Sequence, residues 1–169
     1  DDEDDGTVEI GENSPTMEEH MKGYSSDKIR NIVLLGHGST GKTTFLEAGL
    51  LNTKVISRLG KVESGNTVSD YEKMEIEKGY TINQTLVPVE YKGTKLNFID
   101  TPGFFDFAGE VKQALRVADI GVICVSAKDG LNVGAEKSWK LLKEAKIPRA
   151  IYISKIDEDH ADFDRTFDQ

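Results

Sequence analysis

The sequence is poor in cysteine, lacks long apolar runs and carries no excess of basic residues. One cysteine occurs in 169 residues, and no apolar run approaches the roughly 18 residues that suggest a membrane-spanning helix. No basic segment followed by an apolar run, as in a secretory leader, stands near the start of the chain. These absences favour a cytoplasmic protein with no membrane partner.

The single cysteine, Cys124, lies inside the apolar run 120–125. Such a run predicts a buried strand. We therefore interpret Cys124 as a small packed side chain and not as a reactive thiol.

The net charge of −9 comes from the start of the chain. Residues 1–20 contain nine acidic side chains and no Lys or Arg, whereas the other 149 residues contain 21 acids and 21 bases. The neutral body provides no basic patch for nucleic acid. We expect residues 1–20 to be a disordered acidic leader. His20-Met21 before Lys22 resembles a cloning junction, so we interpret the leader as vector-derived, with a natural acidic tail as the alternative. The remaining residues, 21–169, fit one domain.

Residues 36–43 match the phosphate-binding pattern G-x-x-x-x-G-K-[ST]. In order they are Gly36, His37, Gly38, Ser39, Thr40, Gly41, Lys42 and Thr43. Glycines let backbone N–H groups converge on a polyphosphate, Lys42 supplies charge to the β- and γ-phosphates, and Thr43 is placed to ligate Mg²⁺. We include Thr44, the next residue, among the nucleotide-binding positions. A glycine-rich turn with an incidental lysine is the alternative.

The surrounding sequence supports the phosphate-binding interpretation. Residues 29–35 form a short apolar strand pattern, and residues 42–51 carry apolar residues at spacings that suit a helix. This order of strand, loop and helix places the phosphates at a helix N-terminus, where the helix dipole favours negative charge.

The remaining elements alternate between strand and helix. Residues 52–80 are polar without a sustained period, and loops this long are usually functional or disordered. We expect a hairpin (81–91 and 94–99), a helix (107–117, capped by Asp106), a strand (120–125), a helix (about 134–145, with Trp139, Leu141 and Leu142 in the core) and a strand (149–153). This alternation predicts an α/β domain with a mostly parallel sheet.

Two loops that follow predicted strands carry further chemistry, as open α/β sheets predict. Asp100 ends an apolar strand and can hold Mg²⁺ through water, and Gly103 can offer its N–H to a γ-phosphate. An ordinary turn is the alternative. Asp157 can accept hydrogen bonds from the N1–H and the amine of guanine, which adenine lacks. Lys155 can lay its stem along the base. An exposed lysine and a helix-capping aspartate are the alternative.

The chain resembles translational GTPases of the elongation factor G family over about residues 28–167, most closely their elongation-factor-G-like paralogues. The resemblance includes the phosphate-binding loop and the segments 58–62, 65–71, 100–103, 109–111 and 126–130. It implies a three-layer P-loop NTPase (Ras-like) fold with an antiparallel edge hairpin, GTP and GDP as ligands, Mg²⁺ held by Thr43, Thr81 and Asp100, and Lys42, Thr81 and Gly103 as the catalytic residues. It also implies a ribosome partner, reached through domains absent from this chain.

Three positions depart from the family pattern. Ser154 replaces the Asn of Asn-Lys-x-Asp, which weakens the base pocket. Ser39 stands where main translocases carry Asp, which puts a monovalent-ion site there in doubt. Phe104 replaces the usual His that orients the attacking water, so we expect slow hydrolysis in isolation.

The chain ends twelve residues after Asp157, whereas the family's whole domain continues for another strand and helix. We expect a G domain truncated at its C-terminal end. Two alternatives to an elongation GTPase stay open: a nucleotide-gated switch module with negligible hydrolysis, and a ribosomal-protection-type GTPase. An ATP-using kinase is disfavoured by Asp157.

Overall fold

The computed structural model describes residues 23–64, 66–69, 81–103 and 108–169. Its centre is a five-stranded sheet in the order β2–β3–β1–β4–β5. The strands are β1 (Ile29–Leu35), β2 (Thr85–Tyr91), β3 (Thr94–Asp100), β4 (Ile120–Ser126) and β5 (Arg149–Ser154). Only β2 and β3 pair antiparallel, and the other neighbours are parallel. The predicted mostly parallel sheet with one antiparallel edge hairpin is confirmed.

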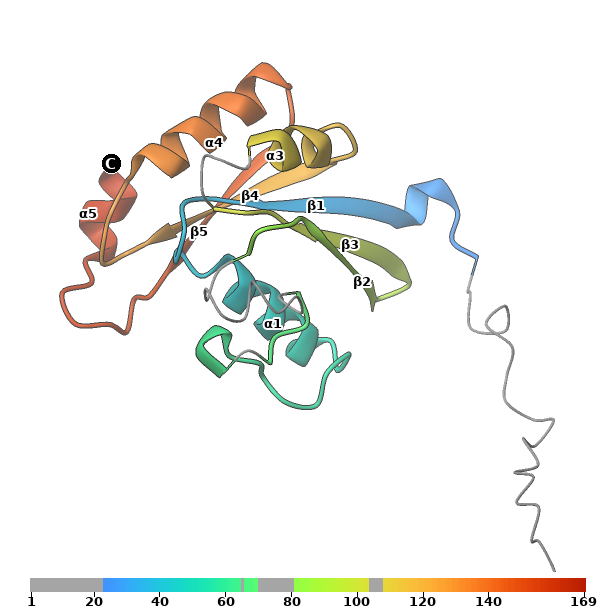
Figure 1. Ribbon diagram of the computed structural model, residues 1–169. Coiled ribbons are helices and arrows are strands. Elements are labelled where there is room, and N and C mark those ends of the chain that lie inside the picture. The colour runs from blue at the N-terminus through green and yellow to red at the C-terminus, as the bar shows by residue number, and fades with distance from the viewer. Residues whose placement is uncertain (1–22, 65, 70–80, 104–107) are drawn as a thin grey trace, which may run out of the picture.

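Helices cover both faces of this sheet and give three layers. They are α1 (Lys42–Asn52), α3 (Ala108–Leu115), α4 (Val133–Glu144) and α5 (Phe163–Asp168), with short 3-10 turns at Ser26–Lys28 and Val62–Ser64. Helix α1 lies on one face, and α3 and α4 lie on the other (Figure 1). Within the described residues, none of these helices has the length and apolar character needed to cross a bilayer.

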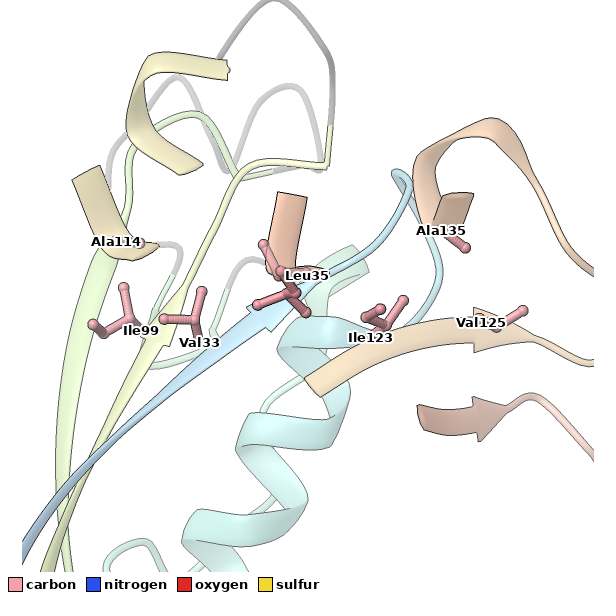
Figure 2. Packing of buried hydrophobic residues seen from close by; sticks show 8 residues of the cluster. Val33, Leu35, Ile99, Ala114, Ile123, Val125 and Ala135 are labelled. Carbon is pink, nitrogen blue, oxygen red and sulfur yellow. The ribbon is translucent and has the colours of Figure 1, made fainter. Parts of the chain in front are cut away.

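Strand β1 fills the middle of the core because its side chains alternate between the two faces. Leu34 packs with Leu46 and Leu50 of α1. Val33 and Leu35 point the other way and join the cluster beneath α3 and α4, which includes Ile123 (Figure 2). A central parallel strand buried on both faces reads as a continuous apolar run, which is the pattern of residues 32–35.

The hairpin starts later than the sequence predicts. Residues 81–84 lie outside β2, which begins at Thr85. Thr81 is buried beside Thr43, and Gln84 N–H donates to Glu110 Oε2 at 3.5 Å. These contacts draw the chain away from the ladder before the strand begins.

The helices differ from the predictions in two details, and a third prediction is untested. Trp139 is 46% exposed and its ring lies under the Arg149 guanidinium at 4.2 Å, so its assignment to the core was wrong, whereas Leu142 is fully buried. Helix α3 ends at Leu115, two residues earlier than expected, because tighter turn bonds from Arg116 and Val117 follow it. The predicted cap Asp106 lies outside the described residues.

Candidate nucleotide-binding site

The loop between β1 and α1 turns sharply through residues with positive φ. The φ angles of Gly36, Ser39 and Gly41 are 138°, 61° and 82°. A Cβ on Gly36 would lie 2.5 Å from the Cys124 carbonyl oxygen in β4, so this position needs glycine. Gly41 is the N-cap of α1 and has no side chain with which to cap it. The first turn of α1 therefore opens toward the loop, as at helix N-termini that bind phosphate.

The Lys42 side chain folds back across this loop. It is buried, and its ammonium donates to the carbonyl oxygen of His37 at 2.9 Å and, more weakly, to that of Gly36 at 3.4 Å. A positive charge is thus held at the centre of the loop.

The loop after β3 closes against the phosphate-binding loop. A Cβ on Gly103 would lie 2.6 Å from the Gly38 nitrogen and 2.7 Å from Lys42 Nζ. Thr101, which is buried, donates its hydroxyl to the Leu34 carbonyl at 2.6 Å and fixes this approach. The glycine predicted to face the γ-phosphate is therefore brought to the Lys42 ammonium.

Three oxygen-bearing side chains meet beside the start of α1. Thr43 donates to Asp100 Oδ2 at 2.8 Å, and the Thr43 and Thr81 hydroxyl oxygens lie 3.5 Å apart. All three residues are at most 7% exposed. One carboxylate and two hydroxyls are hard oxygen donors of the kind Mg²⁺ accepts, with the rest of its octahedron left to water and phosphate. The residues present fit Mg²⁺, and the described part of the chain contains no group of three His, Cys, Asp or Glu side chains that would suit another metal.

Ser154, at the end of β5, reaches the phosphate-binding loop directly. Its buried hydroxyl lies 2.8 Å from the Thr40 carbonyl and 3.2 Å from the Val125 carbonyl. A hydroxyl carries one proton, so it donates to one of these carbonyls at a time. Serine is shorter than the Asn of the family pattern, but it still links the phosphate-binding loop to the sheet.

The turn after β5 carries the residues expected to contact a base. Lys155 adopts a φ of 56° and pairs with Glu158 Oε1 at 3.5 Å, while Lys128 pairs with Glu158 Oε2 at 3.1 Å. The hydrogen bond from Lys128, supported by the charge of Lys155, lowers the pKa of Glu158. Asp157 is exposed in the same turn. Both lysines therefore pair with Glu158, the residue that follows Asp157.

Most predicted site residues thus gather at the carboxyl ends of β1, β3 and β5. The assembled set comprises Gly36, His37, Gly38, Thr40, Gly41, Lys42, Thr43, Thr81, Asp100, Gly103 and Ser154. Ser39 and Thr44 are exposed at the loop and on the first turn of α1. Phe104 lies outside the described residues.

The sequence interpretation missed several residues that shape the site. They are Glu47, Thr101, Lys128 and Glu158. A carboxylate between the buried Leu46 and Leu50 was a usable signal for Glu47, because buried carboxylates need partners. Nothing local in the sequence distinguishes Thr101 from an ordinary turn residue.

Comparisons with known proteins show which family this chain belongs to. The family model described as "Elongation factor Tu GTP binding domain" matches residues 27–169. Elongation factor G of Granulibacter bethesdensis is 42% identical over 148 residues, which are 88% of this chain and 21% of that protein. Mitochondrial ribosome-releasing factor 2 of Debaryomyces hansenii is 38% identical over 149 residues, which are 88% of this chain and 17% of that protein.

A solved structure shows the same fold. The crystal structure of ttk003000868 from Thermus thermophilus has a TM-score of 0.79 and 34% identity, and the match covers 83% of this chain and 21% of that one. The chain spans about a fifth of the length of the curated relatives it matches.

Proposed function

Because the chain belongs to the family of the elongation factor Tu GTP binding domain, we propose that it binds GTP and GDP and hydrolyses GTP in a step of protein synthesis. The observation that carries this proposal is the Lys42 ammonium, held in the centre of a glycine loop at the open N-terminus of α1. We assign residues 21–169 to part of a GTP-binding domain and leave residues 1–20 outside it.

The phosphate-binding loop does most of the binding in this proposal. Backbone N–H groups of Gly38–Thr43 surround the β-phosphate, and Lys42 exchanges its loop carbonyls for phosphate oxygens. The Gly103 N–H faces the γ-phosphate, because Gly103 already lies against Lys42 Nζ.

Thr43, Thr81 and Asp100 are the residues that would hold Mg²⁺. When bound, the ion neutralises charge on the β- and γ-phosphate oxygens. Thr81 contacts the γ-phosphate side only, so it distinguishes GTP from GDP. Lys42, Thr81 and Gly103 then position the reacting phosphate.

Asp157 supplies the proposed preference for guanine. Its carboxylate accepts from two donors that adenine does not present, and sites built for such donors reject analogues lacking them by about 10⁴-fold or more. Ser154 supports this pocket because its hydroxyl donates a hydrogen bond to the Thr40 carbonyl.

Titration of the chain with fluorescent GDP, GTP and ATP in the presence of Mg²⁺ tests this function. We expect guanine nucleotides to bind and ATP to bind far more weakly. Lys42→Ala should weaken GDP about 10- to 100-fold, the loss expected for hydrogen bonds to a charged group. Lys140→Ala, an exposed lysine on α4, is the matched control. Equal affinity for ATP and GTP would overturn the guanine assignment.

Phe104 favours a second function, a switch module with negligible hydrolysis. A phenylalanine cannot orient water through hydrogen bonds, and positioning or acid–base residues contribute about 10²–10⁴-fold to rate. We therefore propose slow turnover in isolation. Single-turnover hydrolysis distinguishes a GTPase from a switch module with negligible hydrolysis. The assay compares Phe104→His with the parent in a full-length factor, with and without ribosomes. Brisk parental turnover with no gain from His would contradict slow hydrolysis.

The ribosome is the proposed partner, contacted through domains beyond the region matched here. The name of the Debaryomyces relative, ribosome-releasing factor 2, supports this choice. A cytoplasmic location stays a prediction, and fractionation of the source cells tests it. The Debaryomyces relative is a mitochondrial protein by name.

A further inference from the structure

The phosphate-binding helix carries a buried carboxylate that the proposed chemistry does not use. Glu47 of α1 is 1% exposed. Its Oε2 accepts the Gly60 N–H at 3.0 Å, and its Oε1 accepts the Val68 N–H at 2.5 Å. Both donors belong to the loop that follows α1, so one side chain holds two points of that loop.

The loop is shaped to reach this carboxylate. A Cβ on Gly60 would lie 2.6 Å from Glu47 Oε2, 2.7 Å from the Asn66 carbonyl oxygen and 2.9 Å from the Thr67 Cα. Position 60 therefore needs glycine, because the backbone there lies so close to the Glu47 carboxylate that a side chain would clash with it. Asn66 closes the loop on itself, since its Oδ1 accepts the Lys61 N–H at 2.8 Å.

The far end of the loop is fixed to the sheet. Ser69 is fully buried, and its carbonyl accepts the Thr85 hydroxyl at 3.0 Å. The described residues 60–64 and 66–69 are thus held between α1 and the start of β2. Buried carboxylates are costly unless several donors satisfy them, so Glu47 is stable only while this loop is docked.

Glu47 is also one helical turn from the proposed metal site. It follows Thr43 by four residues, a spacing that places both on the same side of α1. Thr43 contacts Asp100 and Thr81. The same helix therefore fixes the metal-binding hydroxyl and the loop whose Ser69 carbonyl holds Thr85.

We propose that Glu47 is a positioning residue for the GTP-bound state. By holding Gly60 and Val68 it fixes the loop whose Ser69 carbonyl accepts the Thr85 hydroxyl. It thereby steadies residues 81–85, and so determines whether the Thr81 hydroxyl reaches the γ-phosphate and its metal. This rests on the proposed function. Because Thr81 serves only the triphosphate state, loss of the anchor should weaken GTP-analogue binding while GDP binding is retained.

Glu47→Gln tests this in the 169-residue chain. An amide keeps one acceptor but sets its NH₂ against the second backbone N–H. We expect the ratio of affinities for a non-hydrolysable GTP analogue and for GDP, measured with Mg²⁺ by calorimetry, to fall about tenfold, within the usual range for coupling between sites. Glu144→Gln, an exposed carboxylate on α4, should leave the ratio unchanged.

Gly60→Ala is the second variant, because it pushes the loop off a carboxylate that is still present. It should lower the same ratio, with faster amide exchange at Val68. Two results would overturn the proposal: an unchanged ratio in both variants despite faster exchange at residues 60 and 68, or an equal fall in both affinities, which would make Glu47 a general support of the fold. Failure of the parent chain to bind GDP would instead refute the proposed function.

Discussion

At the scale of single residues, Ser154 decides how well the base side of the site is supported. Ser154→Ala removes the hydroxyl that donates to the Thr40 carbonyl. That loss leaves a buried carbonyl without its donor, which typically costs about 1–3 kcal/mol. We expect weaker GDP binding and a lower free energy of unfolding, measured by calorimetry and urea titration.

The reverse change should strengthen the same support. Ser154→Asn offers two amide protons, enough for the Thr40 and Val125 carbonyls together, and we expect several-fold tighter GDP binding. The exposed Ser57→Ala serves as the control. GDP affinity that is the same for Ser, Ala and Asn at position 154 would mean that this bond does not support the base pocket.

Cys124 gives a second prediction because it is the chain's one thiol. Burial raises its pKa from 9.0 to about 12, so the folded protein keeps the thiol protonated where an unfolded chain would ionise. The contribution of this group to the free energy of unfolding is therefore fully present below pH 9 and is lost as the pH rises toward 12.

Alkylation measures this protection. At pH 8 we expect iodoacetamide to modify Cys124 only as fast as the protein unfolds, with full reactivity in urea. Rapid modification of the native chain at low urea would show that β4 is not closed over the thiol.

Single residues also show what the sequence can reveal. The phosphate-binding loop was predictable because its pattern encodes backbone geometry. Asp100 was predictable because it ends an apolar strand, and Gly103 because it lies in the loop that follows that strand. Glu47 and Thr101 were missed because their partners are backbone groups 13 to 67 residues away. The local pattern around Glu47 signals that its carboxylate needs partners, but no local pattern identifies those partners.

At the scale of elements, the start of α4 is fitted to the phosphate-binding loop. A Cβ on Gly134 would lie 2.7 Å from His37 Cβ and 2.9 Å from the His37 nitrogen. We expect Gly134→Ala to lower the free energy of unfolding by about 1–3 kcal/mol, as overpacking does, and to weaken GDP binding by displacing the loop.

Gly49→Ala is the matched control within α1. Nothing lies within 4 Å of its Cβ position, so the substitution should stabilise the helix by about 0.4–1 kcal/mol. Thermal and urea unfolding of the two variants gives the comparison. A neutral Gly134→Ala would show that α4 can shift without cost.

Element boundaries were predictable where the periodicity was strong. Strand β1 begins and ends where its apolar pattern does, and α1 extends one residue beyond the prediction. The hairpin start was wrong because Thr81 packs beside Thr43 instead of joining the ladder. Helix α5 was missed, although Asp162 caps it by accepting the Arg165 N–H at 2.9 Å, because its six residues are too few to show a period.

At the scale of the whole molecule, β5 is an edge strand of the sheet formed by the described residues, and apolar side chains lie beside it. The exposed side chains there include Trp139, Ile151, Phe163 and Phe167, and a cavity of about 460 Å³ lies between α4, α5 and β5. Unprotected edge strands and apolar patches favour association between chains.

We therefore expect the apparent mass of this 18.7 kDa chain to rise with concentration in sedimentation or light scattering. Ile151→Lys should suppress that rise without changing GDP affinity, because lysine on an edge strand opposes pairing. Val55→Lys, equally exposed beyond α1, is the control. A mass that stays at the monomer value at all concentrations would contradict the prediction.

The folded-back Lys42 has a kinetic consequence. Its ammonium is already held over the loop by the His37 carbonyl, so an arriving phosphate need not wait for a long side chain to be ordered. A side chain that is already ordered loses less conformational entropy when a phosphate binds, which favours tighter binding. Because differences in affinity are expressed mostly in dissociation rates, we expect the ordered Lys42 also to slow the exchange of GDP for GTP.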